Sequence, residues 1–326
     1  MNFSPVLMER DNRKGGSWRE VTLPELPAGT DVQVTGADAS SRSSGVLVGE
    51  LDEDLGGMLT ERWNGSSWRV VPAPTPKQSL GASLLDVEDF SPSNAWAVGY
   101  AQILDGTVPD PDGGLPHQLD HFEPVVRHWD GTAWQVVNMP DVADSWYLQS
   151  MTAVSPHDIW AVGRTQDLKP VVVHYDGTSW SHVPVPAASG ELRSVVASGP
   201  HDVWAVGGMR NADDTGAEAL ALRFDGTAWH RVPMPAGTGV LDHGTATPLG
   251  VAFSGNTDAP DEGDRAPFGI QVEDGRVRPM RLPTGITDVT LTAMDSAGPG
   301  LLMTGFRVIS TDTTYGWIPV LLTGCW

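Results

Sequence analysis

Short apolar runs alternate along the chain with clusters of Pro, Asp, Gly and Ser. In HWDGTAW (128–134) an Asp-Gly pair lies between two aromatic-rich runs, which predicts a β-hairpin because Asp and Gly tolerate the positive φ angles of this turn. In SPHDIWAVG (155–163), Pro and Asp supply a turn and Trp-Ala-Val begins a strand. No long stretch shows a convincing helical period, so the pattern predicts an all-β protein.

Two sequence blocks recur in alternation. The first is SPSNAWAVG (91–99), SPHDIWAVG (155–163) and GPHDVWAVG (199–207). The second is ERWNGSSWRVV (61–71), RHWDGTAWQVV (127–137), VHYDGTSWSHV (173–183) and LRFDGTAWHRV (222–232). Weaker copies complete six units, and the final glycine of the first block stands at Gly49, Gly99, Gly163, Gly207, Gly255 and Gly305.

Each unit holds four short strands, here called a to d in chain order. In the third unit we expect them at Leu148–Val154, Ile159–Gly163, Pro170–Tyr175 and Trp180–Pro184. A repeated unit of four antiparallel strands is typical of a β-propeller blade, which must stack between neighbours to cover both of its apolar faces. The chain therefore predicts a single β-propeller domain over residues 1–326, with six blades favoured and seven as the alternative.

The repeated phrases resemble the blades of galactose-oxidase-like and kelch-like propellers, and more closely the WAVG…HWDGTxW repeat proteins of actinobacteria. This resemblance covers essentially the whole chain and implies the propeller fold, but propellers host many unrelated activities. Galactose oxidase is a copper enzyme that uses a Cys–Tyr crosslink. The single cysteine here, Cys325, is followed only by Trp326, so that chemistry is not carried over.

Closure of the ring depends on the strands at the two ends of the chain. A c-like segment occurs seven times, and the first and last copies are Pro5–Arg10 and Trp317–Thr323. We expect residues 5–22 to hold the closing strands, with Trp18–Thr22 completing the C-terminal blade, since an open sheet edge would expose unpaired backbone groups.

Residues that recur at one position of every unit are interpreted as structural. Repetition predicts core packing for two tryptophan registers, namely Trp96, Trp160 and Trp204, and Trp68, Trp134, Trp180 and Trp229. The pairs His157–Asp158 and His201–Asp202 lie in equivalent a–b turns, where we expect the Asp to bond nearby backbone. No nucleophile elbow, phosphate-binding glycine loop or zinc-protease motif is present.

The connections between strands b and c and between d and a share one end of a propeller, and here they carry nearly all the length variation. Functional residues are concentrated on such loops. The long connections are 49–57, 100–124, 208–218, 255–267 and 306–316. They are rich in Asp and Glu, which predicts an acidic funnel mouth that attracts a cationic ligand or a metal ion, or else serves solubility alone.

The segment 100–124 is the longest of these and is expected to be a loop insertion with a function. It contains His117, Asp120, His121 and Glu123, whose nitrogen and oxygen donors suit acid–base work or a divalent metal. Within it, DPDGG (110–114) has the character of a calcium loop without the full EF-hand spacing, so a calcium ion at 105–123 is one possibility. No other metal or cofactor is predicted.

Two d–a connections bring residues that have no counterpart in the other units. The connection 138–147 supplies Asp141, Asp144, Trp146 and Tyr147, and the connection 239–246 supplies Asp242 and His243. We expect Trp146, Tyr147, His117, His121, Asp242 and His243 to line one pocket at the funnel mouth. Within it, His117, His121, His243 and Asp242 are the catalytic candidates, and Trp146, Tyr147, Asp120 and Asp144 are the ligand-binding candidates.

Composition narrows the choice of partner and compartment. With 20 basic and 41 acidic residues the net charge is -21, which argues against nucleic acid and against an anionic membrane surface. A chain with one cysteine, no long apolar run and a charged N-terminus is expected to be cytoplasmic. The favoured function is a propeller that binds a small molecule or peptide, cationic or aromatic; the alternative is an acid–base enzyme, a cyclase, lyase or hydrolase of actinobacterial specialised metabolism.

Overall fold

A computed structural model describes residues 7–10, 18–26, 30, 32–51, 57–109, 117–210, 217–257, 266–282, 289–297, 300–311 and 314–325. This described part contains strands and turns and no helix, which confirms the all-β prediction. No helix long and apolar enough to cross a membrane occurs among these residues. The chain divides into two compact units, residues 1–151 and 152–326, which are treated separately below.

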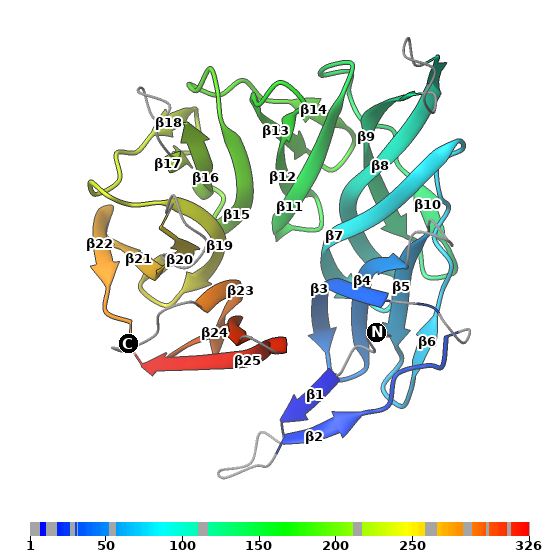
Figure 1. The fold of residues 1–326 in the computed structure, drawn as a ribbon, viewed down its shortest axis with the longest axis horizontal. Helices are drawn as coiled ribbons and strands as arrows, with labels where there is room; N and C mark the ends of the chain where they lie inside the picture. The colour runs from blue at the N-terminus through cyan, green and yellow to red at the C-terminus, as the bar shows by residue number, and fades with distance from the viewer. Residues whose placement is uncertain are drawn as a thin grey trace. The chain divides into compact units, whose positions relative to one another are not determined.

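Unit 1 holds two complete four-stranded antiparallel sheets and a separate hairpin (Figure 1). The hairpin pairs β1 (Leu7–Arg10) with β2 (Trp18–Val21). The first sheet has the order β3 (Val32–Ser41), β4 (Ser44–Leu51), β5 (Met58–Trp63) and β6 (Trp68–Val70). The second has the order β7 (Ser79–Ser91), β8 (Asn94–Val108), β9 (His117–Trp129) and β10 (Trp134–Val136).

A third four-stranded sheet begins with the strand that spans the border of the units, and the remaining sheets follow in unit 2. The third sheet is β11 (Trp146–Ser155), β12 (Asp158–Thr165), β13 (Pro170–Tyr175) and β14 (Trp180–His182). The fourth is β15 (Glu191–Gly199), β16 (Asp202–Arg210), β17 (Ala217–Phe224) and β18 (Trp229–Arg231). The fifth is β19 (Val240–Thr247), β20 (Gly250–Asn256), β21 (Pro267–Glu273) and β22 (Arg276–Met280). The sixth is β23 (Val289–Ala297), β24 (Gly300–Thr311) and β25 (Thr314–Cys325).

The six sheets correspond to the six predicted blades: five have the strand order a, b, c, d, and the sixth has a, b, c among the described residues. One expectation stays a prediction, and another differs from what the structure shows. The strand at Trp18–Val21 pairs with Leu7–Arg10, and the sixth sheet has three strands among the described residues, so ring closure by Trp18 stays a prediction. The segment 100–124 is not a simple loop, because β8 and β9 continue their pairing from Tyr100↔Pro124 out to Val108↔His117 and form a long hairpin arm (Figure 1).

The recurrent tryptophans form the packing between strands, as repetition predicts. Trp96, Trp160 and Trp204 of the first register are buried, and so are Trp134, Trp180 and Trp229 of the second, whereas Trp68 is only half-buried. The Trp160 ring stacks on His174 with centroids 4.1 Å apart. Burial of rings this large is a main source of stability for a blade, because each removes extensive apolar area from water.

The Asp residues of the c–d turns are structural as well. Asp130, Asp176 and Asp225 each accept hydrogen bonds from the backbone and hydroxyl of the Thr two residues on and from the next backbone N–H. These bonds hold the pKa of Asp176 down at about 2, with the Thr178 hydroxyl as the largest cause. The a–b turn residues depart from expectation: Asp158 accepts from the His174 side chain at 2.7 Å, and Asp202 from Arg223 at 2.6 Å, rather than from nearby backbone alone.

A buried carboxyl in the first blade makes stability depend on pH. Glu61 on β5 is 2% exposed, its Oε2 has no partner among the described residues, and burial raises its pKa to about 7. Since the folded-state pKa exceeds the ordinary value of 4.5, folding favours the protonated form and stability falls as the pH rises from about 4.5 to about 7. We expect this loss to be about 1–2 kcal/mol, which is less than the pKa shift alone would give, because the protein around a buried charge relaxes and acts as a medium of intermediate dielectric constant.

The replacement Glu61→Leu should remove this loss, since the equivalent position of the fourth blade is the buried Leu222. The measurement is urea unfolding of both proteins at pH 4.5 and pH 8. Burial also raises the pKa of Asp86, to about 6, but Asp86 is present in both proteins and cancels from the difference. Equal pH dependence of the two proteins would contradict the assignment to Glu61.

Candidate functional site

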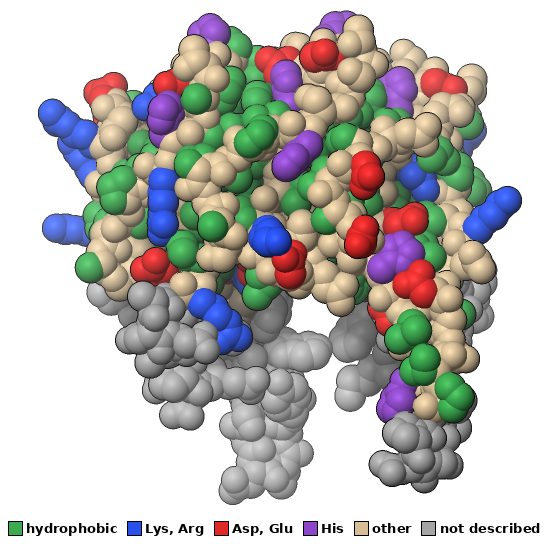
Figure 2. All heavy atoms as spheres, turned by 90° about the horizontal axis from the view of Figure 1, so that it is seen from above, with side chains coloured by type: hydrophobic (Ala, Val, Ile, Leu, Met, Phe, Trp, Pro, Cys, Tyr) green, Lys and Arg blue, Asp and Glu red, His purple; other side chains and the backbone are tan. Residues whose placement is uncertain are grey.

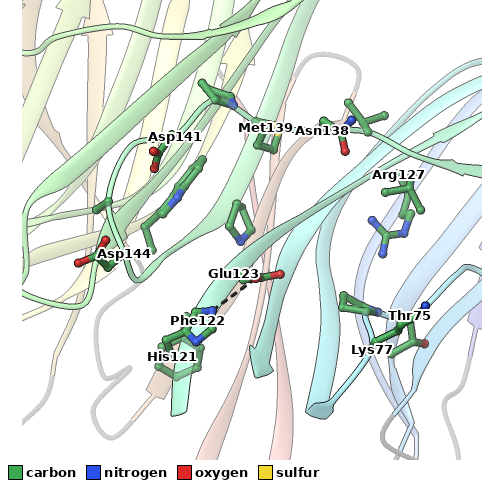
Figure 3. Close-up of a pocket in the computed structure, with 17 residues that line it drawn as sticks. Thr75, Lys77, His121, Phe122, Glu123, Arg127, Asn138, Met139, Asp141 and Asp144 are labelled. Carbon is green, nitrogen blue, oxygen red and sulfur yellow. Dashed lines mark hydrogen bonds and ion pairs between the residues drawn. The ribbon is translucent and has the colours of Figure 1, made fainter. Parts of the chain in front are cut away.

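A pocket of about 550 Å³ lies within unit 1, beside the hairpin arm (Figure 3). Three segments form it: the β6–β7 connection, the stretch of β9 from His121 to Arg127, and the end of β10 with the β10–β11 connection. Its lining residues are Thr75, Pro76, Lys77, His121, Phe122, Glu123, Pro124, Arg127, Val136, Val137, Asn138, Met139, Pro140, Asp141, Ala143, Asp144 and Trp146. His121, Asp144 and Trp146 of the predicted site are thus brought together, along with Asp141.

His121 is held between two carboxylates. Its Nδ1 lies 2.8 Å from Asp105 Oδ1 and its Nε2 lies 3.3 Å from Glu123 Oε1. These bonds raise the imidazole pKa, with the Asp105 bond as the largest cause, so the ring tends to keep its proton. A protonated imidazole with both nitrogens engaged is a poor general base but a good fixed positive charge.

The other polar candidates of the arm lie outside the pocket. His117 opens β9 opposite Val108 and is exposed. Asp120 accepts a 2.7 Å hydrogen bond from the Gln102 side chain across the β8–β9 pair. Among the described residues no cluster of His, Cys, Asp and Glu is suited to a metal ion. The DPDGG segment expected to favour calcium lies outside the described residues.

Aromatic side chains form one wall of the pocket and the layer next to it. Trp146 is 4% exposed, so it belongs to the packed interior as well as to the lining. Phe122 packs against Tyr100 and Tyr147 with centroids 5.7 and 5.6 Å apart, and its backbone N–H donates to Ser145 Oγ at 2.9 Å. Tyr147 therefore supports the lining residue Phe122 without lining the pocket itself.

Three lining carboxylates and three basic side chains surround the pocket, and one of each, Glu123 and His121, are bonded to each other. In Figure 3, Asp141 and Asp144 lie on one side, and Arg127 lies on the other with Lys77 below it. Asp141, Asp144 and Lys77 are exposed, whereas Arg127 is 3% exposed. Sequence analysis missed Arg127 because it lies inside a repeat block; the signal was a cation at a position that is Val173 and Leu222 in other blades.

The second predicted half of the site, in unit 2, is an ion-pair network. Asp242 Oδ1 lies 2.6 Å from Arg193 Nη1, Arg193 also pairs with Glu191, and Glu191 Oε2 lies 3.1 Å from Arg164 Nε. Arg193 was not predicted, and it stands where a β-bulge interrupts the β15–β16 register. Burial lowers the pKa of His243, which favours its neutral form. A pocket shared by residues of both halves stays a prediction.

The acidic funnel mouth also stays a prediction, because most of its carboxylates lie outside the described residues. On the face shown in Figure 2, carboxylates occur singly or in small groups between basic, histidine and apolar side chains.

Comparison with known proteins bears on the fold. No family model matches the chain and no curated protein matches it, so the resemblance to actinobacterial repeat proteins stays a prediction. Three similar solved structures are YCF48 bound to a D1 peptide, the SapL1 lectin in complex with alpha methyl fucoside, and the Aleuria aurantia lectin, described as a six-bladed β-propeller.

Their TM-scores are 0.53, 0.53 and 0.50 at 14%, 12% and 10% identity. The matches cover 98%, 88% and 89% of this chain and 86%, 94% and 95% of the other chains. At such identities the likeness concerns the fold alone, and it agrees with the six repeated sheets. The chain is an all-β propeller with six blades.

Proposed function

We propose that the protein is a binding propeller whose unit 1 pocket holds a small molecule or a short peptide. Two of the similar structures are lectins, one of them in complex with alpha methyl fucoside, and a third is bound to a peptide, so the fold supports both ligand classes. The observation that carries the proposal is the pocket itself: it has a volume of about 550 Å³, one aromatic wall formed by Phe122 and Trp146, and ionisable side chains of both signs in its lining.

The lining favours binding over acid–base catalysis. Asp141 and Asp144 are exposed carboxylates beside an apolar surface that includes Phe122 and Met139, which suits a ligand with a cationic group and an apolar or aromatic body. Both ring nitrogens of His121 are engaged, by Asp105 and Glu123, and these carboxylates raise its pKa, which favours the protonated form over a general base.

A pocket-filling variant tests the proposal. Ala143 lines the pocket, and Ala143→Trp should occupy its volume and weaken binding at least tenfold, because the ligand and the indole compete for one space. The matched control is Ala133→Trp, in the exposed turn before β10 of the same blade. The measurement is calorimetric titration with tryptamine, benzylamine and a set of tripeptides.

We expect at least one of these compounds to bind the unmodified protein and the control with equal affinity. If none binds, or if Ala143→Trp binds as well as the control does, this pocket is not the binding site.

A further inference from the structure

A buried cation lines the pocket without a carboxylate partner. Arg127 is 3% exposed and forms no ion pair with any described residue. Its Nε donates to Pro74 O and its Nη1 to Val126 O, both at 2.9 Å, and its Nη2 also donates to Pro74 O. A guanidinium has five N–H groups, so two of them remain for a further acceptor.

Burial lowers the pKa of Arg127 to about 10, which leaves the side chain charged at neutral pH. An unpaired buried charge is costly, and carbonyl oxygens compensate it only in part. A blade does not need a cation at this position for folding, because the equivalent residues are the buried apolar Val173 and Leu222 in two blades and the buried Glu61 in the first. Arg127 thus has a cost in stability, and the other blades have no cation at this position. A buried cation in the wall of a pocket is suited to an anionic ligand group.

Two exposed carboxylates lie across the pocket from Arg127, and the third carboxylate of the lining, Glu123, is bonded to His121. Asp141 and Asp144 come from the β10–β11 connection, and Figure 3 places them across the pocket from Arg127 and Lys77. One ligand that satisfies both walls must carry an anion at one end and a cation at the other.

The size of the pocket limits the length of the ligand that it can enclose. A volume of 550 Å³ corresponds to a linear dimension of about 8 Å, and an extended chain spans about 3.3–3.6 Å per residue. Two or three residues therefore separate the terminal ammonium and carboxylate of a peptide by the width of the pocket, whereas a single amino acid carries both charges too close together.

We propose that the ligand is a short zwitterionic peptide of two or three residues, with its carboxylate on Arg127 and its ammonium at Asp141 and Asp144. This proposal rests on the proposed function of the pocket and adds the class of its ligand. Phe122 and Met139 supply apolar surface for the side chain between the two ends.

Four forms of one tripeptide test the proposal: L-alanyl-L-phenylalanyl-L-alanine with free ends, its N-acetyl form, its C-terminal amide, and the doubly blocked form. Calorimetric titration should show the free peptide binding at least tenfold more tightly than either singly blocked form, because each block removes one charge-assisted contact. The singly blocked forms also separate a free peptide from a protein tail, since a tail offers only one terminus.

Two variants test which wall of the pocket binds the carboxylate of the peptide and which binds its ammonium group. Arg127→Leu reproduces the residue of the fourth blade, and it should remove the difference between the free acid and the amide while it retains the difference between the free amine and the acetyl form. Asp141→Asn combined with Asp144→Asn should have the converse effect. Thermal unfolding checks that each variant is folded.

Equal binding of all four forms, or a free-acid preference that persists in folded Arg127→Leu, would overturn the zwitterion proposal. So would a complete failure of the tripeptides to bind. None of these outcomes decides the proposed function, which depends on the Ala143→Trp comparison with tryptamine and benzylamine.

Discussion

Replacing Asp89 by alanine is expected to lower the free energy of unfolding of unit 1 by about 3–5 kcal/mol. The Asp89 side chain is fully buried and accepts from Arg62 Nη2 at 3.2 Å, from the Ser40 backbone N–H at 3.0 Å and from Ser40 Oγ at 2.7 Å. These bonds join the first blade to the second. Without Asp89 the buried Arg62, which lies over the Trp129 ring at 4.8 Å, loses its only counter-ion among the described residues.

A second substitution identifies the cause of this loss. If the loss of stability in Asp89→Ala comes mainly from the unpaired charge of Arg62, adding Arg62→Leu should restore about 2 kcal/mol of the free energy of unfolding. The double variant no longer contains the buried guanidinium of Arg62 that lacks a counter-ion. Equilibrium unfolding in urea compares the unmodified protein with both variants. A loss below about 1 kcal/mol for the single variant, or a double variant less stable than Asp89→Ala, would contradict this explanation.

Replacing Gly207 by alanine is expected to cost about 3 kcal/mol or more, as in overpacked interiors. An added Cβ would overlap the carbonyl oxygen of Glu191 on the neighbouring strand, next to the β-bulge between Leu192 and Ser194. The strands must then separate, which breaks ladder hydrogen bonds and displaces the Glu191–Arg193 pair.

The control is Gly199→Ala, at the end of the same sheet, where an added Cβ meets open space. It should change stability by less than about 0.5 kcal/mol. Urea unfolding compares the two variants, and similar midpoints would show that the close approach at Gly207 is not required.

The final glycine of the first sequence block recurs for a reason that the sequence alone does not give. Its recurrence marks the unit, but the reason is tertiary: at Gly49, Gly99, Gly207, Gly255 and Gly305 an added Cβ would overlap a carbonyl oxygen of the paired strand. No local signal reports how closely two strands approach, since the bulge that brings them together depends on the pairing itself.

The sequence by itself determined the all-β class, the blade unit and most strand positions. The third blade matches its expected strands within two residues, because the Asp-Gly turn and the runs rich in aromatic and β-branched residues act locally and recur from unit to unit. It also singled out His121, Asp144 and Trp146, which interrupt the repeat and do line the pocket.

Only the tertiary structure decided that 100–124 continues as a paired hairpin, because its polar composition is equally typical of a loop. It also revealed Arg127 and Arg193, which look like ordinary strand residues in the sequence. Their environment comes from segments distant along the chain, Pro74 for the first and Asp242 for the second. Burial and charge pairing arise from such contacts, and these form only when the sheets pack.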